Sequence, residues 1–154
     1  MIIRKAKKND EEFYTEAIYA LAVYEWECYS KFNPKCVFND NIKNEIKDLF
    51  HSKDSIVLIA EKDGQNIWIL AWIIEWASDR YYCNNVFNIH YIFIVEKYRW
   101  NGYWTELMKE LKKEAKKKNI DRITLWVLSD NISSIKFYEH LWYHEYVRQY
   151  ALDI

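Results

Sequence analysis

The sequence predicts one α/β domain in which helices cover both faces of a mixed β-sheet. Its 154 residues suit a single domain, and 51% hydrophobic residues supply enough apolar side chains for a sizeable core. Short β-branched runs alternate with amphipathic helical stripes, and no repeat, linker or low-complexity segment divides residues 1–154. The resulting element order, β-α-α-β-β-β-α-β-α-β, is typical of a sheet flanked by helices on both sides.

Five of these elements lie in the first half of the chain. A strand at 2–6 is followed by a helix that begins with a capping box of Asn9 and Glu12 and frays near Tyr29. A second helix is capped by Asn39 or Asp40 and has Ile42, Ile46, Leu49 and Phe50 on one face. Strands at 55–60 and 66–76 come next. Between the last two strands, Asp63-Gly64 predicts a hairpin turn.

Five more elements follow a polar, aromatic loop at 79–85. They are a strand at 86–95, a long helix with the apolar stripe Trp104, Leu107, Met108, Leu111 and Ala115, a strand at 122–128, a helix at 131–141 and a final strand at 143–152. We expect parallel strands to meet around the long helix, where an open sheet splays and binds its ligand.

The charge balance excludes whole-molecule attraction for nucleic acid or anionic lipid. The 22 basic and 23 acidic residues leave a net charge of −1. The N-terminus turns charged at once and no later window is apolar long enough to span a bilayer, so we expect a cytoplasmic protein. Cys28, Cys36 and Cys83 lack the paired spacing of a zinc site and predict reduced thiols, with no metal centre.

Residues 95–106 carry the skeleton of a phosphate-binding turn between a strand and a helix. Such a turn uses small residues, so that backbone N–H groups and the positive helix end face a phosphate. Arg99 and Gly102 keep this skeleton, whereas Trp100 and Trp104 stand at or beside places that favour small residues. The whole chain has 2 Gly and 8 Trp, although average usage would give about ten or eleven glycines. Tight backbone sites have therefore lost their usual residue.

A second segment completes a family pattern. Asn131 is followed seven residues later by Tyr138 and then by Trp142-Tyr143. With the turn at Arg99 and Gly102, the chain resembles the GNAT superfamily of acyl-CoA-dependent N-acetyltransferases. The corresponding family segments carry Gly or Ala where Trp104 stands here, and Gly where Trp142 stands. The resemblance covers nearly the full chain and implies a mixed, mostly antiparallel sheet of about six strands. Leu21 to Glu25 and Trp126 to Leu128 resemble the diamine and polyamine branch.

The resemblance also implies roles for particular residues. Acetyl-CoA would lie beside the strand at 86–95, with its pantetheine on the backbone and its pyrophosphate on the turn. The implied contacts are Ile92, Ile94, Arg99, Trp100, Asn101, Gly102, Tyr103, Trp104, Thr105 and Asn131. Tyr138 would protonate the departing thiolate. An alkylammonium has no lone pair at neutral pH, so His90 or Glu75 would first accept its proton, directly or through water.

Large aromatic residues recur at places where the family has small ones. Trp68 and Trp72 lie four apart in one strand and therefore share a face. With Trp100, Trp104, Trp142 and Tyr143 they predict an acetyl-CoA cleft overwritten by aromatics, by design or directed selection. Core filling is the alternative interpretation, and it accounts best for Trp126 and Trp76.

Three functions follow from these observations. The first is a repurposed binding protein that holds a small molecule or a protein partner in the aromatic cleft, with little or no acetyltransferase activity. The second is an active acetyl-CoA-dependent N-acetyltransferase of a small amine or polyamine. The third is an oligomer, such as a homodimer, that associates through exposed tryptophans. None of the three calls for nucleic acid or a membrane.

Overall fold

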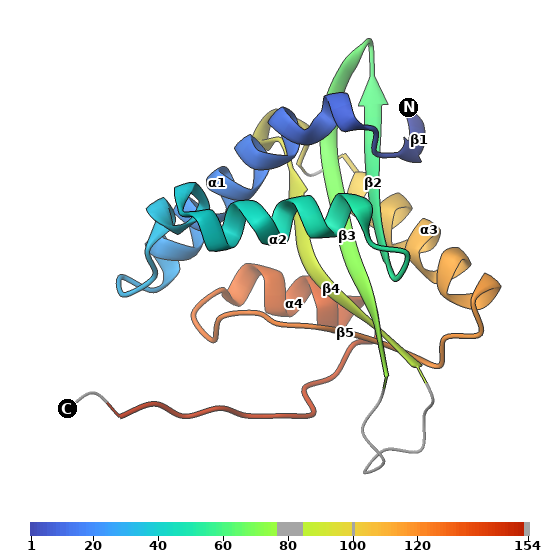
Figure 1. Ribbon diagram of the computed structural model, residues 1–154. Helices are drawn as coiled ribbons and strands as arrows, with labels where there is room; N and C mark the ends of the chain where they lie inside the picture. Colours follow the sequence, from blue (N-terminus) through green and yellow to red (C-terminus); the bar gives the residue numbers. More distant parts are fainter. Residues whose placement is uncertain (77–84, 100, 153–154) are drawn as a thin grey trace.

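A computed structural model describes residues 1–76, 85–99 and 101–152 of the chain (Figure 1). Within these residues, five strands and four α-helices follow one another, with short 3₁₀ turns at Lys8–Asp10, Pro34–Phe38 and Glu96–Tyr98. In chain order these are β1 (Ile2–Lys5), α1 (Glu11–Cys28), α2 (Asp40–His51), β2 (Ser55–Lys62), β3 (Gln65–Trp76), β4 (Asn85–Ile94), α3 (Tyr103–Lys117), β5 (Arg122–Leu125) and α4 (Ile132–His140).

The strands form one sheet in the order β1-β2-β3-β4-β5. Each neighbouring pair is antiparallel except β4 and β5, which run parallel. The predicted hairpin turn joins β2 to β3, where Asp63 and Gly64 both have positive φ angles. The fold is therefore the mixed, mostly antiparallel sheet that the sequence predicts.

The predicted final strand at 143–152 is wrong, and the sheet has five strands. This segment forms neither helix nor strand, and most of its side chains are exposed. Its residues are good strand formers, but a strand needs a paired edge and a surface to bury its side chains. Residues 143–152 form no ladder with the described strands.

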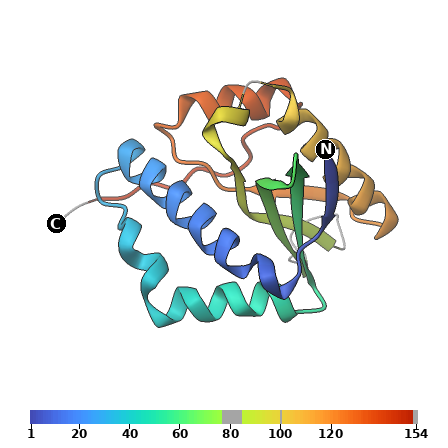
Figure 2. The same cartoon turned by 90° about the horizontal axis from the view of Figure 1, so that it is seen from above.

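Helices cover both faces of the sheet (Figure 2). On one face α1 and α2 bury Tyr14, Ile18 and Ile46 against the strands. On the other face, the apolar stripe of α3 packs on the sheet, and Phe137 of α4 joins the same cluster. Alternation along β3 divides its side chains between these two cores.

Trp68 and Trp72 lie in the core between the sheet and α3. Both belong to the cluster that contains Leu107, Met108 and Leu111, which confirms that they share a face. Each is 0% exposed, so neither side chain reaches the surface. Burial of large aromatic rings in a sheet core favours the core-filling interpretation for these two tryptophans.

The start of α1 differs from the predicted capping box. Asp10, not Asn9, occupies the N-cap, and its carboxylate accepts the backbone N–H of Lys7 at 2.7 Å. Arg4 donates two further hydrogen bonds to this buried carboxylate, at 2.6 and 2.8 Å, and holds the pKa of Asp10 below its usual range. The predicted cap of α2 is confirmed, since Asn39 accepts the N–H of Ile42.

Candidate acetyl-transfer site

A β-bulge at His90 interrupts the pairing of β3 with β4. Ala71 lies opposite Tyr91, but the next residue, Trp72, lies opposite Ile89, so His90 is the extra residue. A bulge bends the strand and re-aims side chains, which is why bulges are frequent beside active sites.

The bulge places two consecutive side chains on one face of the sheet. Ile89 and Ile92 pack in the α3 core, whereas Tyr91 packs in the α1–α2 core. His90 lies on the same side as Tyr91, because its Nδ1 atom is 3.8 Å from Glu45 Oε1 of α2. As the extra residue, His90 therefore lies on the face of the sheet that α1 and α2 cover.

Carboxylates surround this imidazole. The Nε2 atom of His90 is 3.9 Å from Glu75 Oε1 of β3, on the other side of the ring from Glu45. Glu75 also accepts a hydrogen bond from Asn88 Nδ2 at 3.1 Å. The structure thus brings together His90 and Glu75, the two residues predicted as proton acceptors, and adds Glu45.

Tyr91 links Glu45 to the interior of the sheet. Its hydroxyl donates to Glu45 Oε1 at 2.8 Å, and burial raises the pKa of Tyr91, with further contributions from Glu45 and Glu25. Burial also raises the pKa of the Glu25 carboxyl in α1. An uncharged Tyr91 and a partly desolvated acidic cluster together make this face attractive for a cation.

Beyond the bulge, β4 parts from β5. Their parallel ladder runs from Val86 with Arg122 to Ile89 with Leu125 and ends there. The N–H of Val95 bonds toward β3, so by antiparallel alternation the backbone groups of Ile92 and Ile94 point toward the β5 side. The carbonyl of Ile94 is taken by Arg99 Nε at 3.1 Å. Ile92 is left with its backbone donor and acceptor facing the splay, where the family resemblance predicts pantetheine.

The turn after β4 ends at the N-terminus of α3. Gly102 is its N-cap, with φ of 76°, a conformation that side-chain-bearing residues rarely adopt. The first intrahelical bond runs from Thr105 N to Gly102 O, so the N–H groups of Tyr103 and Trp104 precede it. Such a helix end can hold an anion such as pyrophosphate. The side chain of Asn101 bonds the carbonyl of Arg99, which shapes the turn.

Known proteins share this architecture. Residues 18–142 match the sequence model of the acetyltransferase (GNAT) family. The chain belongs to the GNAT family. It is 27% identical over 138 residues to an uncharacterised N-acetyltransferase of Archaeoglobus fulgidus, covering 90% of this chain and 89% of that protein.

Solved structures agree with the GNAT fold. A possible acetyltransferase of Clostridium difficile superposes with a TM-score of 0.76 at 21% identity, over 99% of this chain and 97% of the other. An aminoglycoside 6'-N-acetyltransferase of Acinetobacter haemolyticus gives 0.73 at 19% identity, over 100% and 99%. A third, AAC(6')-Iy in complex with a CoA-containing bisubstrate analogue, gives 0.74 at 16% identity, over 99% and 97%. Acetyl-CoA is thus the acyl donor of the family.

Within this GNAT fold, Arg99, Tyr24 and Asn131 connect three elements at the end of β4. The guanidinium of Arg99 lies over the rings of Tyr24 and Phe93, at 6.0 and 5.9 Å from their centroids. The Tyr24 hydroxyl in turn donates to Asn131 Oδ1 at 3.2 Å, and the same oxygen caps α4 by accepting the N–H of Ser134. Asn131 therefore has a structural role that joins α1 to α4.

Tyr138, the predicted GNAT acid, is buried on α4. Burial raises its pKa, and the nearby Tyr143 adds to the shift. The two rings pack edge to face with centroids 5.8 Å apart. A phenol with a raised pKa keeps its proton at neutral pH and can donate it to a thiolate.

The aromatic residues predicted to overwrite the GNAT cleft do not share one cavity. Trp68 and Trp72 are core residues, and Trp142 is 92% exposed. Tyr143 is partly buried beside Tyr138, and Trp104 packs on Phe137 with ring centroids 5.3 Å apart. Trp100 lies outside the described residues. Of the described tryptophans in that set, Trp104 alone lies at the phosphate-binding turn.

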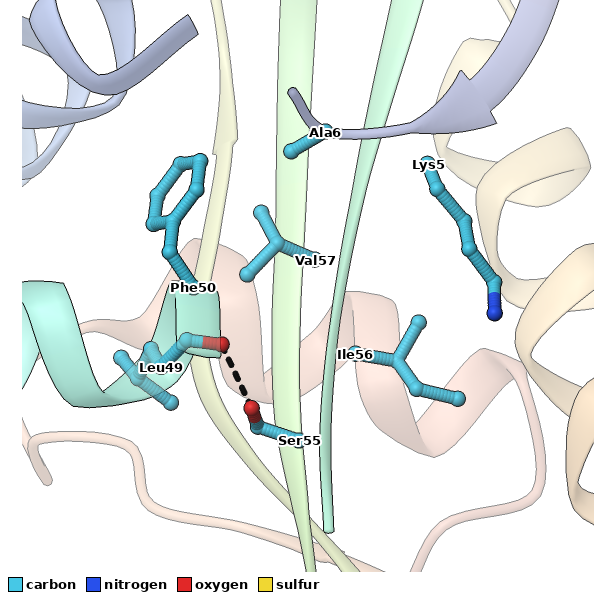
Figure 3. A pocket seen from close by; sticks show the side chains of 7 residues that line it. All are labelled: Lys5, Ala6, Leu49, Phe50, Ser55, Ile56 and Val57. Carbon is cyan, nitrogen blue, oxygen red and sulfur yellow. Dashed lines mark hydrogen bonds between the residues drawn. The ribbon is translucent and has the colours of Figure 1, made fainter. Parts of the chain in front are cut away.

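Two hollows in the described part of the chain border α2 and the start of β2. Figure 3 shows the smaller one, between the start of β2 and the end of α2, where the Ser55 hydroxyl donates to the Leu49 carbonyl. It contains none of the predicted site residues. A second hollow of about 440 Å³ is lined by Asn41, Asn44, Glu45, Asp48, Leu49, Ser52, Ser55 and Ile73. Glu45, one of its lining residues, is also the carboxylate beside His90 Nδ1.

Sequence reasoning did not identify Glu45 or Tyr91 as site residues. A signal existed for Glu45, because it follows Ile42 by three positions and precedes Leu49 by four, which places it on the apolar face of α2. Tyr91 carried no such signal, since its orientation depends on the bulge.

The parts of the chain that the structure describes contain no cluster of three or more His, Cys, Asp or Glu residues suited to a metal ion. Among the same residues, no helix combines the length and apolar character needed to cross a membrane.

Proposed function

We propose that this GNAT-family chain is an active N-acetyltransferase that transfers the acetyl group of acetyl-CoA to a cationic amine. The observation that carries the proposal is the bulge at His90, which holds an imidazole between the carboxylates of Glu45 and Glu75 beside the splay of β4 and β5. A proton acceptor, negative charge for an ammonium group and an open strand edge then occur in one place.

The chemistry divides between the two faces of β4. Glu45 and Glu75 attract the ammonium group, and the imidazole of His90 accepts its proton. The Nε2 atom of His90 is buried and has no hydrogen-bond partner among the described residues, so it is available for this role. The freed lone pair forms a bond to the acetyl carbon, the carbon–sulfur bond breaks, and Tyr138 gives its proton to the departing thiolate.

Backbone groups at the end of β4 and at the start of α3 are positioned to hold acetyl-CoA. The backbone of Ile92 faces the splay, and the first N–H groups of α3 face the turn at Gly102. Lys62 and Lys97 lie near that turn, with Lys62 Nζ bonded to the Tyr103 hydroxyl at 2.7 Å. These positive charges favour the phosphates of coenzyme A.

The substrate class follows from the number of carboxylates. Glu45 and Glu75 lie on either side of His90, and Glu25 lies close enough to the neighbouring Tyr91 to contribute to its raised pKa. Three carboxylates in this region match a molecule with more than one positive charge, such as a diamine or polyamine. The resemblance of Leu21 to Glu25 to the diamine and polyamine branch supports the same class. Aminoglycosides, on which two of the similar structures act by name, are also multivalent amines.

The experiment combines binding and turnover. Titration calorimetry should show micromolar binding of acetyl-CoA, and the chain should acetylate a diamine faster than a monoamine of equal length. His90→Gln should lower kcat about 100-fold while acetyl-CoA binding is unchanged. Glu45→Gln should raise KM for the diamine more than for the monoamine.

The matched control is Glu16→Gln, because Glu16 is an exposed carboxylate elsewhere on α1. Its kinetic constants should equal those of the natural sequence. The proposal fails if acetyl-CoA binds but neither amine is acetylated, or if Glu16→Gln affects KM as much as Glu45→Gln does.

A second candidate function is a binding protein whose acetyl-CoA site is overwritten, as deliberate remodelling of a GNAT scaffold would produce. The contact of Trp104 with Phe137 favours it, since an indole in the first turn of α3 lies beside the phosphate-binding N–H groups. In that case the natural sequence should not bind acetyl-CoA and Trp104→Ala should bind it. Micromolar binding by the natural sequence would exclude this function.

A further inference from the structure

Tyr91 is a partly buried residue of β4 that takes no part in the proposed acetyl transfer. Its ring packs edge to face against the ring of Tyr14 in α1, with centroids 6.1 Å apart. Its hydroxyl donates a hydrogen bond to Glu45 Oε1 of α2 at 2.8 Å. Because the ring and the hydroxyl are both held, the direction of the O–H group is fixed.

The carboxylate oxygen that Tyr91 holds is also the oxygen that faces the imidazole. Glu45 Oε1 lies 3.8 Å from His90 Nδ1, which is within ion-pair distance. Tyr91 and His90 are consecutive residues, and consecutive side chains of a regular strand point to opposite faces of the sheet. The bulge turns both toward α2. One oxygen of Glu45 therefore meets a phenol and an imidazole from the same strand.

The other ring nitrogen of His90 has different surroundings. Its Nε2 atom is buried and has no hydrogen-bond partner among the described residues. Glu75 Oε1 is 3.9 Å away, and Asn88 holds that carboxylate through the other oxygen, Oε2. Buried N–H groups without a partner are rarer in proteins than buried acceptors without one. This favours the tautomer with its proton on Nδ1, toward the carboxylate that Tyr91 fixes.

We propose that Tyr91 is a positioning residue that acts through Glu45, keeping the ring proton of His90 on Nδ1 and leaving the Nε2 lone pair for the proton of the amine. The inference rests on the proposed function, in which His90 accepts that proton. The proton passes to Nε2, and the amine nitrogen keeps the electron pair of the broken N–H bond. The imidazolium that results is stabilised by the charge of Glu45, which itself takes no proton.

Nitrogen NMR of the histidine rings reads the tautomer without any turnover. At about pH 9 imidazoles are neutral, and a ring nitrogen that carries a proton resonates far from one that does not. His90→Gln identifies the His90 signals among those of the four histidines. In the natural sequence Nδ1 should carry the proton. In Tyr91→Phe the two nitrogens should share it, which would shift both resonances toward each other.

Kinetics test whether this position of the proton matters for transfer. Tyr91→Phe keeps the ring in the core and removes only the donor, so kcat should fall about tenfold while the acetyl-CoA dissociation constant is unchanged. Tyr14→Phe is the matched control. Its ring packs on the same tyrosine, but its buried hydroxyl has no hydrogen-bond partner among the described residues, so kcat should stay unchanged.

A double-mutant cycle separates positioning from packing. Because Tyr91 acts through Glu45, Tyr91→Phe should lower kcat less than about twofold in a chain that already carries Glu45→Gln. A tyrosine that only fills the core would give the same loss in both backgrounds.

Four results would overturn the proposal. They are a ring proton on Nε2 in the natural sequence, an unchanged tautomer in Tyr91→Phe, equal losses of kcat in Tyr91→Phe and Tyr14→Phe, and additive losses in the cycle. A natural sequence that acetylates no amine would contradict the proposed function instead, and the NMR comparison would still decide whether Tyr91 sets the tautomer of His90.

Discussion

Tyr138 of α4 is buried and packs against Tyr143, and burial raises the pKa of its hydroxyl. If it is the acid of acetyl transfer, Tyr138→Phe should lower kcat about 100-fold. Removal of one hydroxyl should leave the acetyl-CoA dissociation constant unchanged. Steady-state kinetics and calorimetry on the same preparation check both values.

Tyr143→Phe is the control for this prediction, because it removes the neighbouring hydroxyl from the same aromatic pair. Its kcat should stay near that of the natural sequence. Equal losses in both variants would mean that the pair stabilises α4 without acting in proton transfer.

Trp142 adopts a left-handed backbone conformation, with φ of 69°, at the end of α4. The sequence predicts such a residue here, and the structure confirms it. A side chain in this conformation costs roughly 1 kcal/mol, and the indole recovers little because it is 92% exposed. Trp142→Gly should therefore raise the free energy of unfolding by about 1 kcal/mol.

Urea unfolding at one fixed protein concentration measures this change. Trp142→Ala removes the same indole but keeps a side chain at positive φ, so it should show no gain. An equal gain in both variants would place the effect in the indole and not in the backbone.

The element that organises the site is the bulged strand β4. One extra residue, His90, shifts the alternation so that Tyr91 faces α2 while Ile92 faces α3. The same strand loses its β5 partner after Ile89. A proton acceptor on one face and a free backbone edge on the other are therefore consequences of one irregularity.

Helix caps act at the same scale, and two of them can be compared. Asn39 caps α2 through a single bond to Ile42, whereas the buried Asn131 caps α4 and also accepts from Tyr24. Asn39→Ala should cost about 1 kcal/mol of unfolding free energy, and Asn131→Ala about 2 kcal/mol, because the latter also leaves the Tyr24 hydroxyl without this acceptor.

Chemical denaturation of the two variants tests this order. Activity gives a second measure, since Asn131→Ala should also lower acetyl transfer by loosening α1 from α4, and Asn39→Ala should not. A smaller stability loss in Asn131→Ala than in Asn39→Ala would contradict the joining role.

For the molecule as a whole, buried tyrosines predict sensitivity to alkali. Burial raises the pKa of Tyr143 to about 12, and it also raises those of Tyr14, Tyr91 and Tyr138. The unfolded chain loses these protons near pH 10. Stability contributed by the protonated form is fully present below about pH 10 and is lost as pH rises through the folded-state value.

The free energy of unfolding should therefore fall steadily between about pH 10 and pH 12. Tyr143→Phe should remove about 2 kcal/mol of that fall, as measured by urea unfolding at each pH. Tyr98→Phe serves as the control, because this ring lies at the surface turn beside Lys97. Identical alkaline slopes in the two variants would contradict the prediction.

For the whole molecule, much of the architecture could be predicted from the sequence. The stripe from Leu107 to Ala115, the hairpin at Asp63-Gly64 and the cap at Asn39 depend on neighbours within a few residues, and all three are present. The bulge at His90 could not be predicted, because the residue types of β4 are compatible with a regular strand and with a bulged one. The prediction of a final strand failed for a related reason, since strand composition does not reveal whether a segment will lie along a sheet edge.

The sequence by itself determined the order of elements, the GNAT pattern of Arg99, Gly102, Asn131 and Tyr138, and the left-handed position at Trp142. These depend on local spacing, helix periodicity and the steric limits of single residues. Tertiary structure alone decided that Trp68 and Trp72 fill the core, that Glu45 and Glu75 lie on either side of His90, and that residues 143–152 form no strand. Burial and charge proximity depend on which strands and helices pack together. The register of β3 on β4 decides which residues, far apart in the chain, become neighbours.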